Sequence, residues 1–239
     1  MTQDKEVFSQ HISQQFNAEL EEIRTQLLEM GGLVEKQVSD AVTALIEADG
    51  KLAEEVRQND RKINDMERKI DEECMRILAR RQPAASDLRL VISITKIIVD
   101  LERIGDEASK IAKRALQLVE EGQSPRGYVE CRHIGHHVRK MVQDALDAFA
   151  RFDTVQALAV AREDKVVDQE YKSATRELVT YMMEDPRSIT RVLSILWVLR
   201  SLERVGDHAR NVAEQVIYLV KGQDVRHIGL SNMEEVVKD

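Results

Sequence analysis

Two acid pairs stand at helical spacing in this chain, each inside a copy of the motif Leu-Glu-Arg-Ile/Val-Gly-Asp. Glu102 and Asp106 belong to the first copy, and Glu203 and Asp207 to the second. Residues i and i+4 share one face of a helix, so each motif places two carboxylates one turn apart. Like charges at this spacing repel by a few tenths of a kcal/mol. A cation offsets that repulsion, and carboxylate oxygens suit Mg²⁺, Mn²⁺ or iron.

Ordinary ion pairs explain the same acids without a metal. Basic residues at helical spacing give three such pairs: Asp106–Lys110, Glu203–Arg200 and Asp207–Arg210. Ion pairs of this kind are common on helix surfaces and contribute little to stability. Each motif also contains a glycine, Gly105 or Gly206, although glycine in a helix interior costs about 1 kcal/mol relative to alanine. A missing side chain lets a neighbouring helix or a ligand approach closely. Both interpretations stay open.

Further acids precede each motif in the chain. Asp60 and Glu67 flank an apolar stripe that includes Ile63, and their counterparts in the second half are Glu163 and Glu170. If the helix that carries them packs antiparallel to the helix of the motif, these acids come near the duplicated pairs. We therefore treat them as weaker candidate metal ligands.

Three histidines cluster at 133, 136 and 137, with His133 and His137 four residues apart. The nearby Glu130-Cys131-Arg132-His133 is a single Glu-x-x-His, whereas di-iron bundles need two. The corresponding positions of the first half hold no histidine, so we interpret the cluster as a local feature. The chain contains no glycine-rich phosphate loop, no Ser or Cys nucleophile motif and no paired Cys-x-x-Cys. We expect no enzymatic activity. The alternative is a metal-carboxylate helical-bundle enzyme or a metal-storage protein.

Composition narrows the class of protein. The 239 residues are 43% apolar and 4% aromatic, with ten Gly and three Pro, which disfavours β sandwiches and barrels. A net charge of −8 argues against nucleic-acid binding. The two cysteines fit a reducing compartment. The first six residues do not resemble a signal peptide, and no apolar run approaches the length of a membrane span. We therefore expect a cytoplasmic protein.

The sequence contains an internal duplication. Residues 88–119 align with 189–220 at an offset of 101, and 12 of the 32 pairs are identical. Upstream, residues 30–83 align with 133–186 at an offset of 103. The difference predicts a connection two residues shorter in the second copy. Pro125 lies between the copies.

Each copy predicts three helices. Apolar residues recur at i, i+3, i+4 and i+7 along residues 97–119 and along two earlier stretches of the first copy. Asp49-Gly50 ends the first helix, and Pro83 and Pro186 end the second helix of each copy. The second copy has Phe152-Asp153 where the first has Asp49-Gly50, so no glycine marks that boundary. The expected fold is all-α, with two tandem, pseudo-symmetric, antiparallel three-helix bundles over residues 1–122 and 123–239.

These motifs resemble the PhoU family of phosphate-specific transport system accessory proteins. The similarity extends from about residue 11 to about residue 229 and includes further segments: RQPAASDLR at 81–89, REDKVVDQEY at 162–171, YMMED at 181–185 and VKGQDVRH at 220–227.

The resemblance implies two three-helix bundles and negative regulation of the phosphate-starvation (Pho) regulon. It implies as partners the ATPase subunit of the phosphate ABC transporter and the sensor histidine kinase PhoR, and it implies a homodimer. The family's Glu/Asp-x-x-x-Asp motifs are reported to bind metal clusters, which would place Fe, Mn, Mg or Zn on the two acid pairs. In the preceding helix Glu67 and Asp71 match that pattern, whereas Glu170 is followed by Ala174. Equal metal binding by both copies is therefore not implied.

Overall fold

The computed structural model describes residues 14–124 and 126–238, and every regular element in these ranges is helical. The elements are α2 (Gln14–Glu47), α3 (Gly50–Arg81), α4 (Ala85–Glu121), α5 (Tyr128–Arg151), α6 (Thr154–Glu184), the 3₁₀ helix η1 (Pro186–Ser188), α7 (Ile189–Lys221) and α8 (Leu230–Lys238). Pro125 lies outside the described residues. No helix over the described residues has the length and apolarity needed to cross a membrane.

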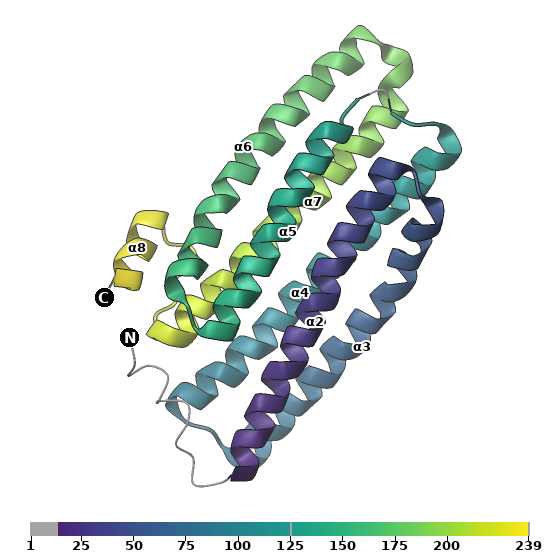
Figure 1. Ribbon diagram of the computed structural model, residues 1–239. Helices are drawn as coiled ribbons and strands as arrows, with labels where there is room; N and C mark the ends of the chain where they lie inside the picture. The colour runs from purple at the N-terminus through teal and green to yellow at the C-terminus, as the bar shows by residue number, and fades with distance from the viewer. Residues whose placement is uncertain (1–13, 125, 239) are drawn as a thin grey trace.

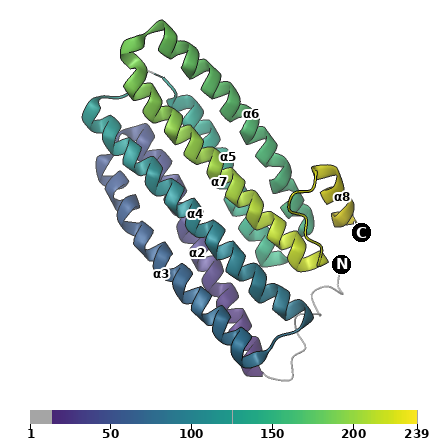
Figure 2. The ribbon, with the colours of Figure 1, turned by 180° about the vertical axis from the view of Figure 1, so that it is seen from behind.

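Six long helices form two antiparallel three-helix bundles that lie side by side. Helices α2, α3 and α4 pack together, as do α5, α6 and α7 (Figure 1). The bundles join along two seams, α4 against α7 and α2 against α5, while α3 and α6 lie on opposite flanks (Figure 2). The expected all-α architecture of tandem bundles is confirmed. The boundary between residues 122 and 123, as a division into separate folding units, stays a prediction.

Apolar stripes on the two halves meet in one continuous core. The seam between α4 and α7 buries Ile94, Ile97 and Ile98 of α4 at positions that correspond to Ile195, Val198 and Leu199 of α7. Burying each such side chain stabilises the fold by about 1.5–3 kcal/mol relative to exposure. The duplicated helices therefore hold both bundles together.

Aspartates start the second helix of each bundle. Asp49 Oδ1 accepts hydrogen bonds from two backbone N–H groups of α3 at 3.0 Å, and Asp153 Oδ1 accepts the equivalent pair in α6 at 2.9 and 3.0 Å. Phe152 ends α5 in the left-handed region, with φ of 55°. Both predicted boundaries are thus confirmed, although neither uses glycine: Ala48, with φ of 54°, and Phe152 adopt the left-handed conformation that glycine usually supplies at a helix end.

The register between the copies differs from the predicted one. Buried residues of α2 and α3 recur in α5 and α6 at an offset of 104 rather than 103: Met30–Ile134, Val38–Val142, Ala53–Ala157, Val56–Val160, Ile63–Val167 and Ile70–Ala174. The identities that suggested 103, such as Lys62 with Lys165, are exposed and do not fix which face packs inward. The offset falls from 104 to 101 before the third helix, so the second copy lacks three residues there, and the predicted difference of two was wrong.

Glycines let α2 and α5 approach closely. A Cβ at Gly31 would overlap the end of Leu146, and one at Gly135 would lie 2.8 Å from a methyl group of Val42. These two contacts are equivalent under the offset of 104. Gly32, the next residue along α2, is exposed and has no atom within 4 Å of its Cβ position. The seam between α2 and α5 thus requires glycine at residue 31 and not at residue 32.

We expect Gly31→Ala and Gly32→Ala to differ in stability. Both substitutions gain about 1 kcal/mol of helix propensity. Only the first also adds a methyl group against Leu146, and overpacking of this kind costs about 1–3 kcal/mol. Urea denaturation of both variants measures that cost as the difference between their free energies of unfolding. Equal stabilisation by the two substitutions would contradict the close packing of α2 on α5.

Candidate metal-binding acid clusters

The first acid cluster lies where α3 packs on α4. Gly105 permits this approach, because a Cβ there would be 3.1 Å from Ile63 Cδ1 and 3.7 Å from Asp60 Oδ1. Gln37 of α2 donates hydrogen bonds of 3.4 Å to Asp60 Oδ1 and to the Gly105 carbonyl. Asp60 is therefore held beside the motif that carries Glu102, as the sequence led us to expect.

Burial and mutual repulsion shape the chemistry of this first cluster. Desolvation raises the pKa of Glu102, and the Asp106 carboxylate raises it further, with smaller effects from Glu67 and Asp60. The pKa of Asp60 rises for the same two reasons, burial and Asp106. Arg103 opposes these effects, with its guanidinium 3.5 Å from Glu102 and 3.8 Å from Asp106. Four carboxylates thus share one seam with one arginine that is itself half exposed.

Asp71 extends this cluster along α3. Its carboxylate, together with burial, raises the pKa of Glu67, on which Asp106 also acts. Asp71 itself is exposed. The Glu67–Asp71 pair therefore borders the cluster from the solvent side.

The second acid cluster contains two aspartates of α6 that the sequence analysis missed. Burial raises the pKa of Glu203, and Asp207, Asp168 and Asp164 raise it further. Burial and Asp168 likewise raise the pKa of Asp207. A Cβ at Gly206 would lie 3.7 Å from Asp164 Oδ1, which repeats the position of Asp60 beside Gly105. The offset of 104 pairs Asp60 with Asp164. The helix-capping aspartates Asp49 and Asp153 share this offset, so aligning the copies on them would have identified Asp164 as a candidate.

Glu163 and Glu170 do not occupy the positions that we expected. They lie against α5: Glu170 carboxylate oxygens are 3.0 Å from His133 Nε2 and 3.2 Å from His137 Nδ1, and Glu163 Oε1 is 3.9 Å from His137 Nδ1. The one-residue error in register assigned them to the wrong helix face. The acids that approach the second motif are Asp164 and Asp168 instead.

The alternative of simple surface ion pairing is only partly confirmed. The three cations that we expected beside these acids form the pairs Arg200–Glu203 at 2.5 Å, Lys110–Glu107 at 2.9 Å, Arg210–Glu214 at 3.0 Å and Arg210–Asp164 at 3.1 Å. The first was predicted. The cations expected beside Asp106 and Asp207 bind other carboxylates, and Asp106 is paired instead with Arg103 at 3.8 Å. The predicted ion pairs therefore do not account for the duplicated aspartates.

The chemistry of both clusters fits a hard cation. All their donors are carboxylate oxygens, the ligands that Mg²⁺ and Mn²⁺ prefer. In the second cluster Glu203 Oε2 is buried and has no hydrogen-bond partner, although such atoms usually have one. Asp207 also lines a cleft of about 600 Å³ between α4 and α7, which gives ions a route from solvent. These residues would hold the metal, and the metal would neutralise their repulsion.

We expect Glu102→Gln to stabilise the metal-free protein at neutral pH, because it removes a carboxylate whose ionised form is disfavoured by burial. Relief of the i,i+4 repulsion alone amounts to ~0.5 kcal/mol. The pKa of Glu102 in the folded protein lies above its unfolded value, so the gain is complete above the folded pKa. The gain in stability disappears as the pH falls through the folded-state pKa towards the ordinary pKa of glutamate.

Urea denaturation with a chelator, at neutral pH and near the ordinary pKa of glutamate, measures this effect. Glu72→Gln, an exposed change on α3, is the matched control and should leave stability nearly unchanged at both pH values. A Glu102→Gln variant that is less stable than the wild type at neutral pH would contradict the electrostatic description of the cluster.

Comparison with known proteins identifies the family. The PhoU domain model matches residues 27–115 and again 131–216. The phosphate-specific transport system accessory protein PhoU homolog of Pseudomonas putida is 73% identical over 98% of this chain and 92% of its own length, and PhoU of Escherichia coli is 51% identical over 96% and 95%. The crystal structure of PhoU from Pseudomonas aeruginosa superposes with a TM-score of 0.86 at 74% identity, covering 87% of this chain and all of that one. The phosphate transport system regulatory protein PhoU from Streptococcus pneumoniae gives a TM-score of 0.81 at 35% identity, with coverage of 88% and 99%. The chain belongs to the PhoU family.

Proposed function

We propose that this protein is a non-enzymatic, cytoplasmic adaptor that negatively regulates the Pho regulon. In this role it couples the phosphate ABC transporter to the sensor histidine kinase PhoR and modulates phosphate uptake. The observation that carries the proposal is the similarity over nearly the whole length to relatives named phosphate-specific transport system accessory proteins. Its direct partners are the ATPase subunit of the transporter and PhoR, and it acts as a homodimer.

An exposed apolar stripe on α7 supports a role in protein contact. Ile189, Leu193 and Trp197 follow one another at intervals of four residues, with 40%, 42% and 58% of their surface exposed. The Arg114 guanidinium lies 5.9 Å from the centre of the Trp197 ring. Exposed aromatic and aliphatic side chains in a row, beside arginine, are typical of the anchors of protein interfaces.

The charge of the protein defines which partners fit. The net charge of −8 disfavours nucleic acid and complements basic protein surfaces. Contact with the membrane then arises only through the transporter and the kinase. Metal ions on Glu102, Asp106, Glu203 and Asp207 would change this charge, so we propose that Fe, Mn, Mg or Zn tunes binding to the partners.

Deletion of the gene in its host tests the regulatory role. We expect a reporter of the Pho regulon to become active in phosphate-rich medium and to be repressed again by the wild-type gene. Trp197→Ala should restore less repression at equal protein level, because it removes the largest side chain of the α7 stripe. Val155→Ala, an exposed apolar change on α6, should restore repression fully. A reporter that stays repressed without the gene would show that the proposed function is wrong.

Thermal denaturation with Mg²⁺ or Mn²⁺ tests the metal proposal. Ligand binding to the folded state at 100 times the dissociation constant adds about 2.7 kcal/mol, so we expect the melting temperature of the metal-free protein to rise. The combined variant Glu102→Gln, Asp106→Asn, Glu203→Gln, Asp207→Asn should lose most of this rise, while Glu72→Gln keeps it. An equal rise in all three proteins would contradict metal binding at the motifs. Oxidase or phosphatase turnover that depends on Glu102 and Glu203 would instead support the alternative of a metal-carboxylate enzyme.

A further inference from the structure

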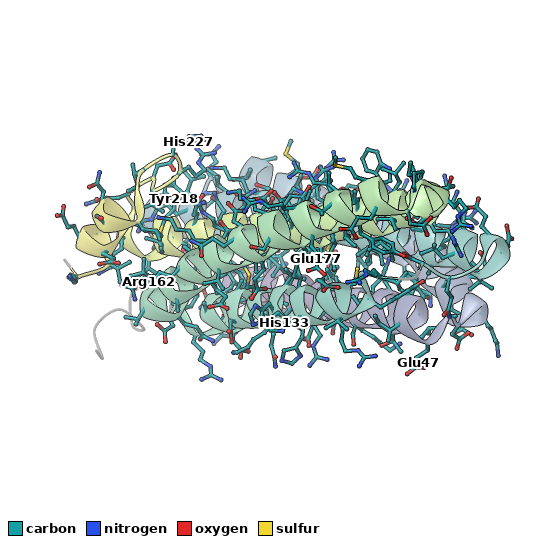
Figure 3. All side chains as sticks on the ribbon, turned by 90° about the horizontal axis from the view of Figure 1, so that it is seen from above. Glu47, His133, Arg162, Glu177, Tyr218 and His227 are labelled. Atoms are coloured by element: carbon teal, nitrogen blue, oxygen red, sulfur yellow. The ribbon has the colours of Figure 1, made fainter. Side chains whose placement is uncertain are left out.

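A second kind of ligand set lies on the outer surface of the second bundle, where α5 meets α6. His133 and His137 stand one turn apart on α5, with ring centres separated by 4.6 Å. Glu170 of α6 reaches both rings: its Oε1 is 3.0 Å from His133 Nε2 and its Oε2 is 3.2 Å from His137 Nδ1. One donor atom from each of the three residues lies within 4.8 Å of the others. Figure 3 labels His133 on α5.

Two donor atoms of this cluster are buried without a hydrogen bond. His137 Nδ1 and Glu170 Oε2 are both shielded from solvent, and neither has a hydrogen-bond partner although they are 3.2 Å apart. Leaving a buried donor or acceptor without a partner costs the free energy of its desolvation. A cation that binds the lone pairs of both atoms removes this cost.

The charges around the histidines also favour a cation. Glu163 Oε1 lies 3.9 Å from His137 Nδ1, so two carboxylates of α6 face the two imidazoles. Two basic side chains of α5 pair with other acids: Arg139 lies 3.6 Å from Glu35, and Lys140 lies 2.7 Å from Asp144. A divalent ion neutralises the two carboxylates, and either Glu163 or water can supply a fourth ligand.

We propose that His133, His137 and Glu170 form a site for a borderline divalent transition metal, with Zn²⁺ as its representative. Two imidazole nitrogens and a carboxylate oxygen are typical zinc ligands, with bonds of about 2.0–2.1 Å that place neighbouring ligand atoms roughly 3.3 Å apart. The separations of 3.0 and 3.2 Å are close to that spacing. Mg²⁺ prefers oxygen ligands and competes poorly for imidazole. The site therefore differs in selectivity from the carboxylate clusters at the motifs.

The first copy provides an internal comparison. At the offset of 104, the positions of His133, His137 and Glu170 correspond to Glu29, Leu33 and Met66. Neither leucine nor methionine is a ligand for a divalent ion of this class. The proposed site therefore belongs to the second copy and has no counterpart in the described residues of the first, in contrast to the duplicated acid clusters.

Isothermal titration of the metal-free, full-length protein with Zn²⁺ in excess Mg²⁺ tests the proposal. We expect one high-affinity equivalent per chain that Mg²⁺ does not displace. His137→Ala and Glu170→Gln should each weaken it at least about tenfold, the lower end of what the loss of even an outer-shell partner causes. His136→Ala, which changes an exposed histidine between the two ligands, is the matched control and should bind as the wild type does.

Two further measurements make the result decisive. Co²⁺ in place of Zn²⁺ should give a visible d–d absorption in the wild type and in His136→Ala, and lose it in the double variant His133→Ala, His137→Ala. Melting of each variant without metal establishes that the fold is intact. Zn²⁺ binding of equal affinity in the double variant, or complete displacement by Mg²⁺, would overturn the proposal. Loss of binding in the quadruple variant of the acid motifs, with both histidines present, would also overturn it.

Discussion

The absence of a side chain at Gly105 and Gly206 lets the outer helices pack closely enough to bury carboxylates in a helix–helix seam. A Cβ at Gly105 would lie 3.1 Å from Ile63, which is a tight contact, whereas one at Gly206 would lie 3.6 Å from Val167, which is an ordinary van der Waals contact. A side chain longer than a methyl group would meet the outer helix at either position. Each glycine costs about 1 kcal/mol of helix propensity. In return the seam holds an aspartate of the outer helix beside the Glu-x-x-x-Asp pair. The position of both acid clusters follows from this one packing constraint.

Burial of several acids in one helix–helix seam places more negative than positive charge there. Desolvation and mutual repulsion raise the pKa of Glu102 in one bundle and of Glu203 and Asp207 in the other. Arginines offset part of the charge, more fully in the second bundle, where Arg200 and Arg210 each bind a carboxylate of the cluster. The two clusters are therefore not equivalent, although the motifs differ only by Ile104 in place of Val205. A metal ion that binds one more strongly than the other is the expected consequence.

The sequence predicted those features that depend on the spacing of apolar residues and on repeated motifs. The helices, their ends, the duplication and the approach of Asp60 to the first motif all followed from spacing. The register of α6 did not, because exposed identities such as Lys62 with Lys165 suggested an offset that burial contradicts by one residue. That error hid Asp164 and directed Glu170 to the wrong face. Helix α8 was also missed, although Leu230, Met233, Val236 and Val237 recur at helical spacing and pack on the core, because the duplication, which ends before it, predicts only three helices per copy.

Close packing beside Gly105 and the neighbouring Asp106 raise the pKa of Glu102, and a bound cation would lower it. Carbon-13 NMR titration of the Glu102 carboxyl, first in metal-free protein and then with saturating Mg²⁺, tests this relation most directly. The account predicts a midpoint above the ordinary glutamate pKa without metal, because burial and Asp106 raise it, and a lower midpoint once the ion binds. An ordinary midpoint that Mg²⁺ does not change would contradict the account.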